Sequence, residues 1–181
     1  MSHIHHIFRE IFQQEPITLS IPNWSTFSPE TFIKSQGQQA PNHLQLAIAG
    51  RKDAQLHFYN DAFQSYYSNL VTSALQVNLW YSPMEAITKA FLKAGHPIQG
   101  INLYFLGTAE RKKGKTYELL MKTAMAKAID ELYALNLERD ALIRLICSTN
   151  ENSVLDALFL GQIFPQVTIE TEQTLQMLAG G

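Results

Sequence analysis

The sequence contains one cysteine, Cys147, among 181 residues, which excludes an internal disulfide and any zinc site built from several cysteines. A single thiol fits a reducing cytoplasm. No apolar stretch approaches the roughly 20 residues that span a bilayer. The N-terminus lacks the basic and then apolar order of a signal peptide. We therefore expect a cytoplasmic protein that does not enter a membrane.

Charge is also scarce, because charged residues make up 17% of the chain and the net charge is −2. Neither sign predominates, so no global electrostatic attraction to nucleic acid or to an anionic membrane is expected. No set of Cys, His, Asp and Glu has the spacing of metal ligands, and His5 and His6 cannot share one face of a helix. We predict that the protein binds no nucleic acid and requires no metal ion.

The hydrophobic fraction of 46% is sufficient for a large core. The length suits one domain, 1–181, in which a helical and extended segment over 1–40 packs on an α/β core. Ser28 is expected to cap a short helix, and "SPME" (82–85) has the form of a capping box. Periodicity predicts helices at about 4–15, 28–35, 61–80, 83–94, 116–135 and 150–160, and strands at 17–21, in a hairpin over 43–59, and at 101–106, 141–147 and 166–175.

Strands and helices alternate in the C-terminal half, which favours a sheet with a parallel portion covered by helices. We therefore predict an α/β fold of mixed α+β character, with a central mixed sheet flanked by helices. The strands at 101–106 and 141–147 are expected to be adjacent and parallel. The helix over 116–135 would join them by a right-handed crossover.

Most of the basic charge near the middle of the chain lies in one stretch, "FLGTAERKKGKTYELL" (105–120). Its cations are Arg111, Lys112, Lys113 and Lys115, at the start of the longest predicted helix. The N-terminus of a helix already carries partial positive charge, so these side chains oppose the dipole. Two explanations remain open: an anion binds there, or the lysines are simply solvated.

A nucleotide-binding P-loop is one form of anion site, and Gly114-Lys115-Thr116 matches its end. The position that requires its first glycine is Ala109. No apolar strand ending in aspartate follows, although such a strand holds Mg²⁺ in these proteins. These departures make the P-loop the weaker interpretation.

The same stretch resembles the acyl-CoA pyrophosphate loop of the GNAT superfamily of N-acetyltransferases. That pattern is Arg or Gln, two residues, Gly, one residue, and then Gly or Ala before a helix. Here Arg111, Gly114 and Thr116 occupy these positions. Leu106 lies five residues before Arg111, where the strand of the family ends and splays to admit pantetheine. Asn150 resembles an asparagine that precedes a later helix in the family.

This resemblance covers about 99–165 and implies an acyl-CoA N-acyltransferase-like fold. It implies transfer of an acyl group from acetyl-CoA or another acyl-CoA to an amine of a small molecule or a protein, by an active or a degenerate enzyme. The general acid of the family falls on Ala157, so Tyr104, Glu110 and His96 are the candidates to take the proton of the amine. The residues implied in cofactor binding are Leu106, Arg111, Lys112, Lys113, Gly114, Lys115, Thr116 and Asn150.

A second hypothesis is a non-enzymatic α/β adaptor or a subunit of a larger assembly. The aromatic-rich segment 61–81 would provide a docking face for a homodimer or a partner protein. The absence of a convincing acid–base pair favours this alternative. Cys147 is expected to be a buried structural thiol, with a nucleophile as the weaker alternative, and the lone His57 is either a general base or, more commonly for such histidines, a surface or satisfied residue.

Overall fold

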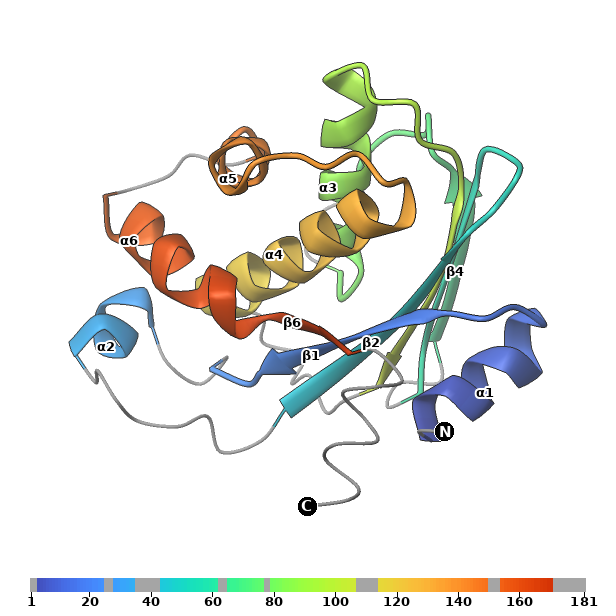
Figure 1. The fold of residues 1–181 in the computed structure, drawn as a ribbon, viewed down its shortest axis with the longest axis horizontal. Coiled ribbons are helices and arrows are strands. Elements are labelled where there is room, and N and C mark those ends of the chain that lie inside the picture. The colour runs from blue at the N-terminus through green and yellow to red at the C-terminus, as the bar shows by residue number, and fades with distance from the viewer. Residues whose placement is uncertain are drawn as a thin grey trace.

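A single mixed sheet organises the part of the chain that the computed structural model describes, which is residues 3–24, 28–34, 43–61, 65–76, 79–106, 114–149 and 154–170. The strand order is β4-β3-β5-β2-β1-β6 (Figure 1). β3 and β5 run parallel, and the other neighbours are antiparallel, so the predicted mixed α/β sheet is confirmed. The strands are β1 (Ile17–Pro22), β2 (His43–Gly50), β3 (Gln55–Asn60), β4 (Ser65–Leu70), β5 (Ile101–Leu106) and β6 (Thr168–Glu170).

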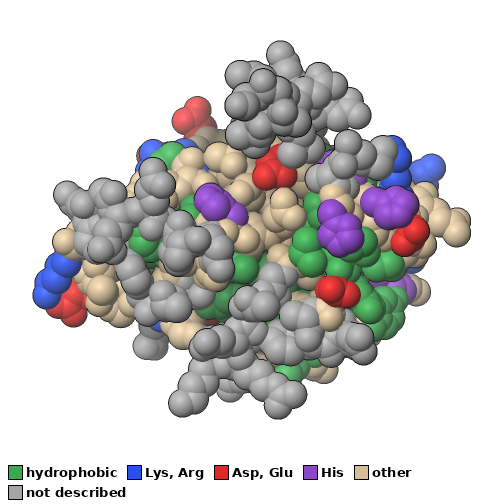
Figure 2. All heavy atoms as spheres, turned by 90° about the horizontal axis from the view of Figure 1, so that it is seen from below, with side chains coloured by type: hydrophobic (Ala, Val, Ile, Leu, Met, Phe, Trp, Pro, Cys, Tyr) green, Lys and Arg blue, Asp and Glu red, His purple; other side chains and the backbone are tan. Residues whose placement is uncertain are grey.

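Helices cover both faces of this sheet unequally (Figure 1). One face carries α3 (Ser82–Lys93), α4 (Lys115–Leu132), α5 (Arg139–Cys147) and α6 (Val154–Ile163). The other face carries α1 (His3–Phe12), and the short α2 (Pro29–Lys34) lies beside α6. Figure 2 shows the α1 side, where the described lysines and arginines lie at the margins and form no continuous basic patch.

The main hydrophobic core lies between the sheet and α3–α6, and a smaller one lies under α1. β5 is central to both, because Leu103 and Phe105 face the main core while Tyr104 packs under Ile4 and Phe8 of α1. α4 is buried along most of its length, since it packs between the sheet and the outer helices. No helix among the described residues is long and apolar enough to cross a membrane.

β2 and β3 are present as predicted, but they do not form the predicted hairpin. β5 is inserted between them, antiparallel to β2 and parallel to β3. The 51–54 connection wraps around Gly100, whose N–H donates to the carbonyl of Asp53 and whose carbonyl accepts from the N–H of Arg51. β5 is the most apolar strand, and the centre of the sheet buries it on both faces. This burial outweighs the local turn signal.

The helix predicted over 61–80 is wrong, because residues 65–70 form the edge strand β4. Tyr67 points into the core and is stacked on Tyr81 at a centroid distance of 3.8 Å, whereas Tyr66 and Leu70 are exposed. The alternation is that of a strand, and pairing with β3 fixes its register.

The strand predicted at 141–147 is also wrong, and with it the expected parallel pairing to 101–106. These residues belong to α5, in which Leu142 and Ile146 are buried one helical turn apart. The continuous apolar run is compatible with a buried strand or a helix, and packing against α4 decides for the helix.

The helix starts were predicted with mixed success. The hydroxyl of Ser28 accepts a hydrogen bond from the N–H of Thr31, so the cap of α2 is confirmed. The capping box of α3 is wrong, because the Ser82 hydroxyl accepts from the N–H of Leu79. Glu85, fully buried, accepts from the N–H of Gln76 and from the hydroxyl of Tyr67.

Candidate functional site

The amino-terminal end of α4 consists of an extended N-cap, Gly114, and the first helical turn, in which the N–H of Glu118 donates to the carbonyl of Gly114 over 3.2 Å. Gly114 caps the helix with φ −72° and ψ 175° and without a side-chain capping bond. The first-turn N–H groups of a helix have no partner within the helix, and the dipole adds positive potential there. This end of α4 follows β5 in the chain. The positive potential of the helix N-terminus suits an anion.

Two ion pairs surround this end of the helix. The Lys115 ammonium lies 2.9 Å from a carboxylate oxygen of Asp156, which α6 contributes and whose side chain is 6% exposed. About two turns further along α4, the Lys122 ammonium lies 2.8 Å from the carboxylate of Glu118. The Lys122 side chain is 2% exposed, which is unusual for lysine. We call Lys115, Glu118, Lys122 and Asp156 the α4 charge cluster.

Burial perturbs the titrating groups in and beside this cluster. Burial lowers the pKa of Lys122, and the hydrogen bond and charge of Glu118 act in the opposite direction. Burial raises the pKa of the Cys147 thiol at the end of α5, and the negative charge of Asp156 raises it further. Cys147 is therefore a protonated thiol at neutral pH rather than a reactive nucleophile.

The structure brings together some of the cofactor-binding residues expected from the sequence. Gly114, Lys115 and Thr116 lie at the start of α4, and Thr116 is 2% exposed. The expected cofactor-binding residues Arg111, Lys112, Lys113 and Asn150 lie outside the described residues. The candidate proton acceptor Glu110 also lies outside them.

The candidate proton acceptors do not come together. Tyr104 is fully buried beneath α1 and stacked on Tyr59 at 5.6 Å, on the face of the sheet opposite α4. Burial, and then the charge of Asp61, raises the pKa of its hydroxyl. His96 follows α3, with its ring 5.5 Å from that of Phe91, on the helical side. Tyr104 and His96 therefore cannot serve one reacting centre.

Leu106 is at the end of β5 as expected, but the strand does not splay there. Leu106 pairs with Gln45 of β2, and Phe105 pairs with Asn60 of β3. Among the described residues, β5 is thus paired with β2 up to Leu106 and with β3 up to Phe105, without the splaying that the resemblance implied.

Sequence reasoning missed the buried members of the α4 charge cluster. The spacing of Glu118 and Lys122 was readable as an i,i+4 pair on a helix. Asp156 carried no local signal, because α6 brings it to Lys115 only in the folded chain.

No protein-family model and no curated protein matches this sequence. Solved structures do resemble the fold. Galactokinase from Lactococcus lactis, complexed with galactose, has a TM-score of 0.57 at 16% identity, over 84% of this chain and 43% of the galactokinase. Lin0012 from Listeria innocua has a TM-score of 0.54 at 7% identity, over 83% of this chain and 46% of the Lin0012 chain.

A third similar structure is Streptococcus pneumoniae phosphomevalonate kinase in complex with phosphomevalonate and AMPPNP. Its TM-score is 0.51 at 18% identity, over 83% of this chain and 46% of the kinase. The chain thus spans less than half the length of each of these structures.

Galactokinase and phosphomevalonate kinase are GHMP kinases, and the fold of this chain resembles their N-terminal domain. The acyltransferase-like fold, the acyl-transfer function and the acyl-CoA cofactor expected from the sequence are therefore wrong. The degenerate match over the basic stretch rested on a strand, a cationic sequence and a helix in succession, and this order does not identify one fold. The fold of this chain, a six-stranded mixed α/β sheet covered by helices, is similar to that of part of these kinases.

Proposed function

We propose that this chain is the nucleotide-binding part of an ATP-dependent small-molecule kinase of the GHMP type. The observation that carries the proposal is the fold similarity to galactokinase and phosphomevalonate kinase, each over more than four fifths of this chain. One of these structures holds AMPPNP, an ATP analogue. The activity of a whole kinase is part of the proposal, because the chain spans less than half of either one.

The start of α4 supports the proposal chemically. The positive end of its dipole suits a chain of phosphates, and the Lys115 ammonium adds a full charge beside it. The cations Arg111, Lys112 and Lys113 directly precede Gly114 in the sequence. The anion that the basic stretch indicated is then the triphosphate of a nucleotide.

Such a nucleotide carries a divalent cation, for which the α4 charge cluster offers two carboxylates that are each paired with a lysine in this structure. Mg²⁺ is typically held by one or two protein carboxylates together with phosphate oxygens and water. Asp156 and Glu118 are the carboxylates of the cluster that would hold it. Bound Mg²⁺ would neutralise charge on the phosphates. Lys115 would then exchange the carboxylate of Asp156 for a phosphate oxygen.

Calorimetric titration of the purified chain with AMPPNP tests the proposal. We expect binding that is lost when EDTA replaces Mg²⁺. Lys115→Gln removes one charge-assisted contact of about 1.5–3 kcal/mol, so the Kd should rise at least about tenfold. Lys52→Gln is the matched control, because Lys52 is exposed in the 51–54 connection, and its Kd should equal that of the wild type.

Binding is measured rather than turnover because the chain spans less than half of the similar kinases. Titration with acetyl-CoA provides a comparison anion of similar phosphate content. Two results would show that no nucleotide binds at the start of α4. They are the absence of heat with millimolar AMPPNP and an equal loss of affinity in the two lysine variants.

A further inference from the structure

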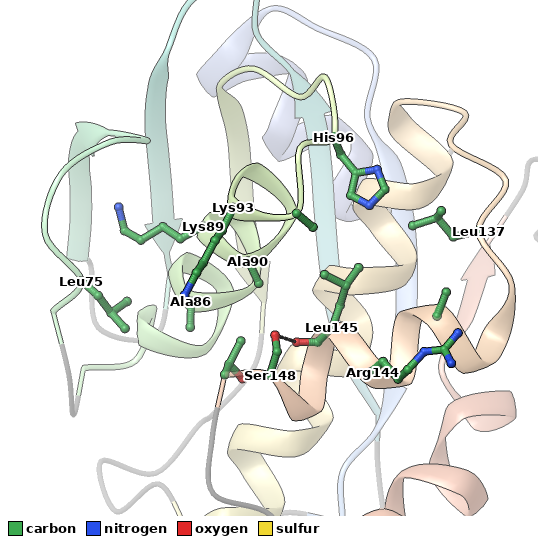
Figure 3. A pocket seen from close by; sticks show the side chains of 13 residues that line it. Leu75, Ala86, Lys89, Ala90, Lys93, His96, Leu137, Arg144, Leu145 and Ser148 are labelled. Atoms are coloured by element: carbon green, nitrogen blue, oxygen red, sulfur yellow. Dashed lines mark hydrogen bonds between the residues drawn. The ribbon is translucent and has the colours of Figure 1, made fainter.

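A groove of about 630 Å³ lies on the outer helical layer, between α3 and α5 (Figure 3). Its floor is apolar and consists of Ala86, Ala90 and Ala94 from the α3 side and Ala141 and Leu145 from α5. Apart from Ala94, which is exposed, these floor residues are half-buried, so the groove is open to solvent along its length.

α5 has more apolar surface than the core uses. Leu142 and Ile146 face the core and are 4% and 0% exposed. Ala141 and Leu145 lie on a second apolar face, which lines the groove, and Leu145 also packs partly against the core. A helix that is apolar on two faces is normally packed on both. The residues of this second face contributed to the strand prediction. The face is only half-buried by the described residues, so it is available to a binding partner.

The charged side chains that line the groove in the described part of the chain all have one sign. These described lining residues include Lys89, Lys93, His96 and Arg144 but no Asp or Glu, although acidic residues outnumber basic ones in the chain. The Lys89 ammonium is used within the fold, since it donates to the carbonyls of Val71 and Ser73. No ion pair involves Lys93 or Arg144 among the described residues.

Lys93 and Arg144 lie on opposite sides of the floor, one from each helix (Figure 3). An occupant that satisfies both must present carboxylates on two sides of an apolar strip. A molecule with a single anionic head and an apolar tail satisfies only one side. From Ala86 to Ala94 the floor extends for about 12 Å along α3, because a helix rises 1.5 Å per residue. That length corresponds to about two turns of a partner helix.

We propose that this groove binds an amphipathic α-helix of a partner protein, whose apolar face is flanked by Asp and Glu. Apolar side chains of that helix pack on Ala90 and Leu145, and its carboxylates pair with Lys93 and Arg144. This is the helix-in-groove mode, in which apolar anchors supply affinity and the charged rim supplies orientation and specificity. The inference does not depend on nucleotide binding, because α3 and α5 form the groove without the start of α4.

A display library of helices tests the proposal, with leucines fixed at i, i+4 and i+7 and the flanking positions random. The bait is the full chain. We expect the selected peptides to be enriched in Asp and Glu at the flanks. By fluorescence anisotropy, Ala90→Arg should abolish binding because its side chain fills the groove. Ala54→Arg, in the exposed 51–54 connection, is the control and should bind normally.

Reversing the charges of the groove and of the peptide tests whether the predicted ion pairs form. Lys93→Glu with Arg144→Glu should weaken the acidic peptide at least about fivefold, as expected for two rim ion pairs. The same peptide with its flanking carboxylates changed to lysine should bind this double variant better than it binds the wild type. Far-UV circular dichroism of each variant confirms that it is folded.

Several results would overturn the proposal. Selection of no peptide, or of peptides without acidic flanks, would do so. Unchanged affinity of the acidic peptide for the charge-reversed variant would show that Lys93 and Arg144 do not contribute to its recognition. If dodecanoate binds and Ala90→Arg blocks it while no helix competes, the groove is a small-amphiphile site. If Ala90→Arg turns a dimer of the chain into a monomer, the groove is occupied by a second copy.

Discussion

Replacement of Gly100 by alanine should destabilise the protein through one steric conflict. Gly100 lies inside the 51–54 connection, and a Cβ there would lie 2.1 Å from the carbonyl oxygen of Gln55. It would also lie 2.8 Å from the carbonyl oxygen of Asp53. Both neighbours are backbone atoms, so no side chain can move aside to accommodate the methyl group.

The backbone itself must therefore separate, and this breaks specific contacts. The Gly100 N–H donates to Asp53 over 2.6 Å, and the Gly100 carbonyl accepts from the Arg51 N–H over 2.9 Å. Loss of these bonds costs about 1 kcal/mol each. Forcing a methyl group into a packed site costs ~1–3 kcal/mol more. Alanine also lowers the conformational entropy of the unfolded chain, which offsets roughly 0.4–1 kcal/mol of this loss of stability. We expect a net loss of about 3 kcal/mol.

For a chain of this length a loss of about 3 kcal/mol lowers Tm by roughly 6–12 °C. Differential scanning calorimetry and urea unfolding would measure the two quantities. Gly50→Ala is the matched control, because a Cβ there meets the Tyr133 hydroxyl at 3.5 Å, an ordinary contact. A Gly100→Ala protein that melts within 2 °C of the wild type, like the control, would refute this account of how β2 and β3 are separated.

Three further predictions concern titration, exposure and reactivity. Burial, with the hydrogen bond to Glu85, raises the pKa of Tyr67 to about 12, whereas an unfolded tyrosine titrates near ~10. Its contribution to stability is complete below about pH 10 and is lost as the pH rises through about 12, so Tyr67→Phe should flatten part of that fall in urea unfolding. Leu158→Lys should change the unfolding free energy by less than ~0.5 kcal/mol, because Leu158 is 51% exposed on α6, and a larger loss by the same assay would show that its face is packed. Cys147 should react with iodoacetamide more slowly than free cysteine at pH 8 and at the free rate in urea, because burial raises its pKa, and equal rates in both would contradict its burial.

Much of the fold was predictable where a local pattern and tertiary packing agree. α1, β1, β5 and α4 have a clear period, and each was placed within a few residues of its bounds. β4 was not predictable, because Tyr66, Tyr67, Leu70 and Val71 also match a helical period. Only the pairing of β4 with β3 shows that Tyr66 and Tyr67 point to opposite faces. Strand pairing between distant segments is decided by the whole sheet and has no local signature.

The candidate site was predictable in part. The start of α4 was identified from its glycine and cations, since those signals are contiguous in the chain. The chemistry assigned to it was wrong, because charge alone does not distinguish one phosphate-bearing ligand from another. Asp156 and the buried Lys122 were missed for a different reason. Their importance comes from burial, which arises only when α4, α5 and α6 pack together.

The insertion of β5 between β2 and β3 has a consequence for how the chain folds during synthesis. β2 and β3 are complete when residue 60 is made, and β5 begins only at Ile101. At 5–20 residues per second that interval is roughly 2–8 s, whereas a hairpin forms in about 1–10 μs. Two apolar strands joined by a tight connection therefore have ample time to pair with each other in a hairpin that the native sheet does not contain. That hairpin must open before β5 can enter. The local turn signal thus favours a non-native β2–β3 pair in the nascent chain, and the opening of any such pair would precede the completion of the native sheet.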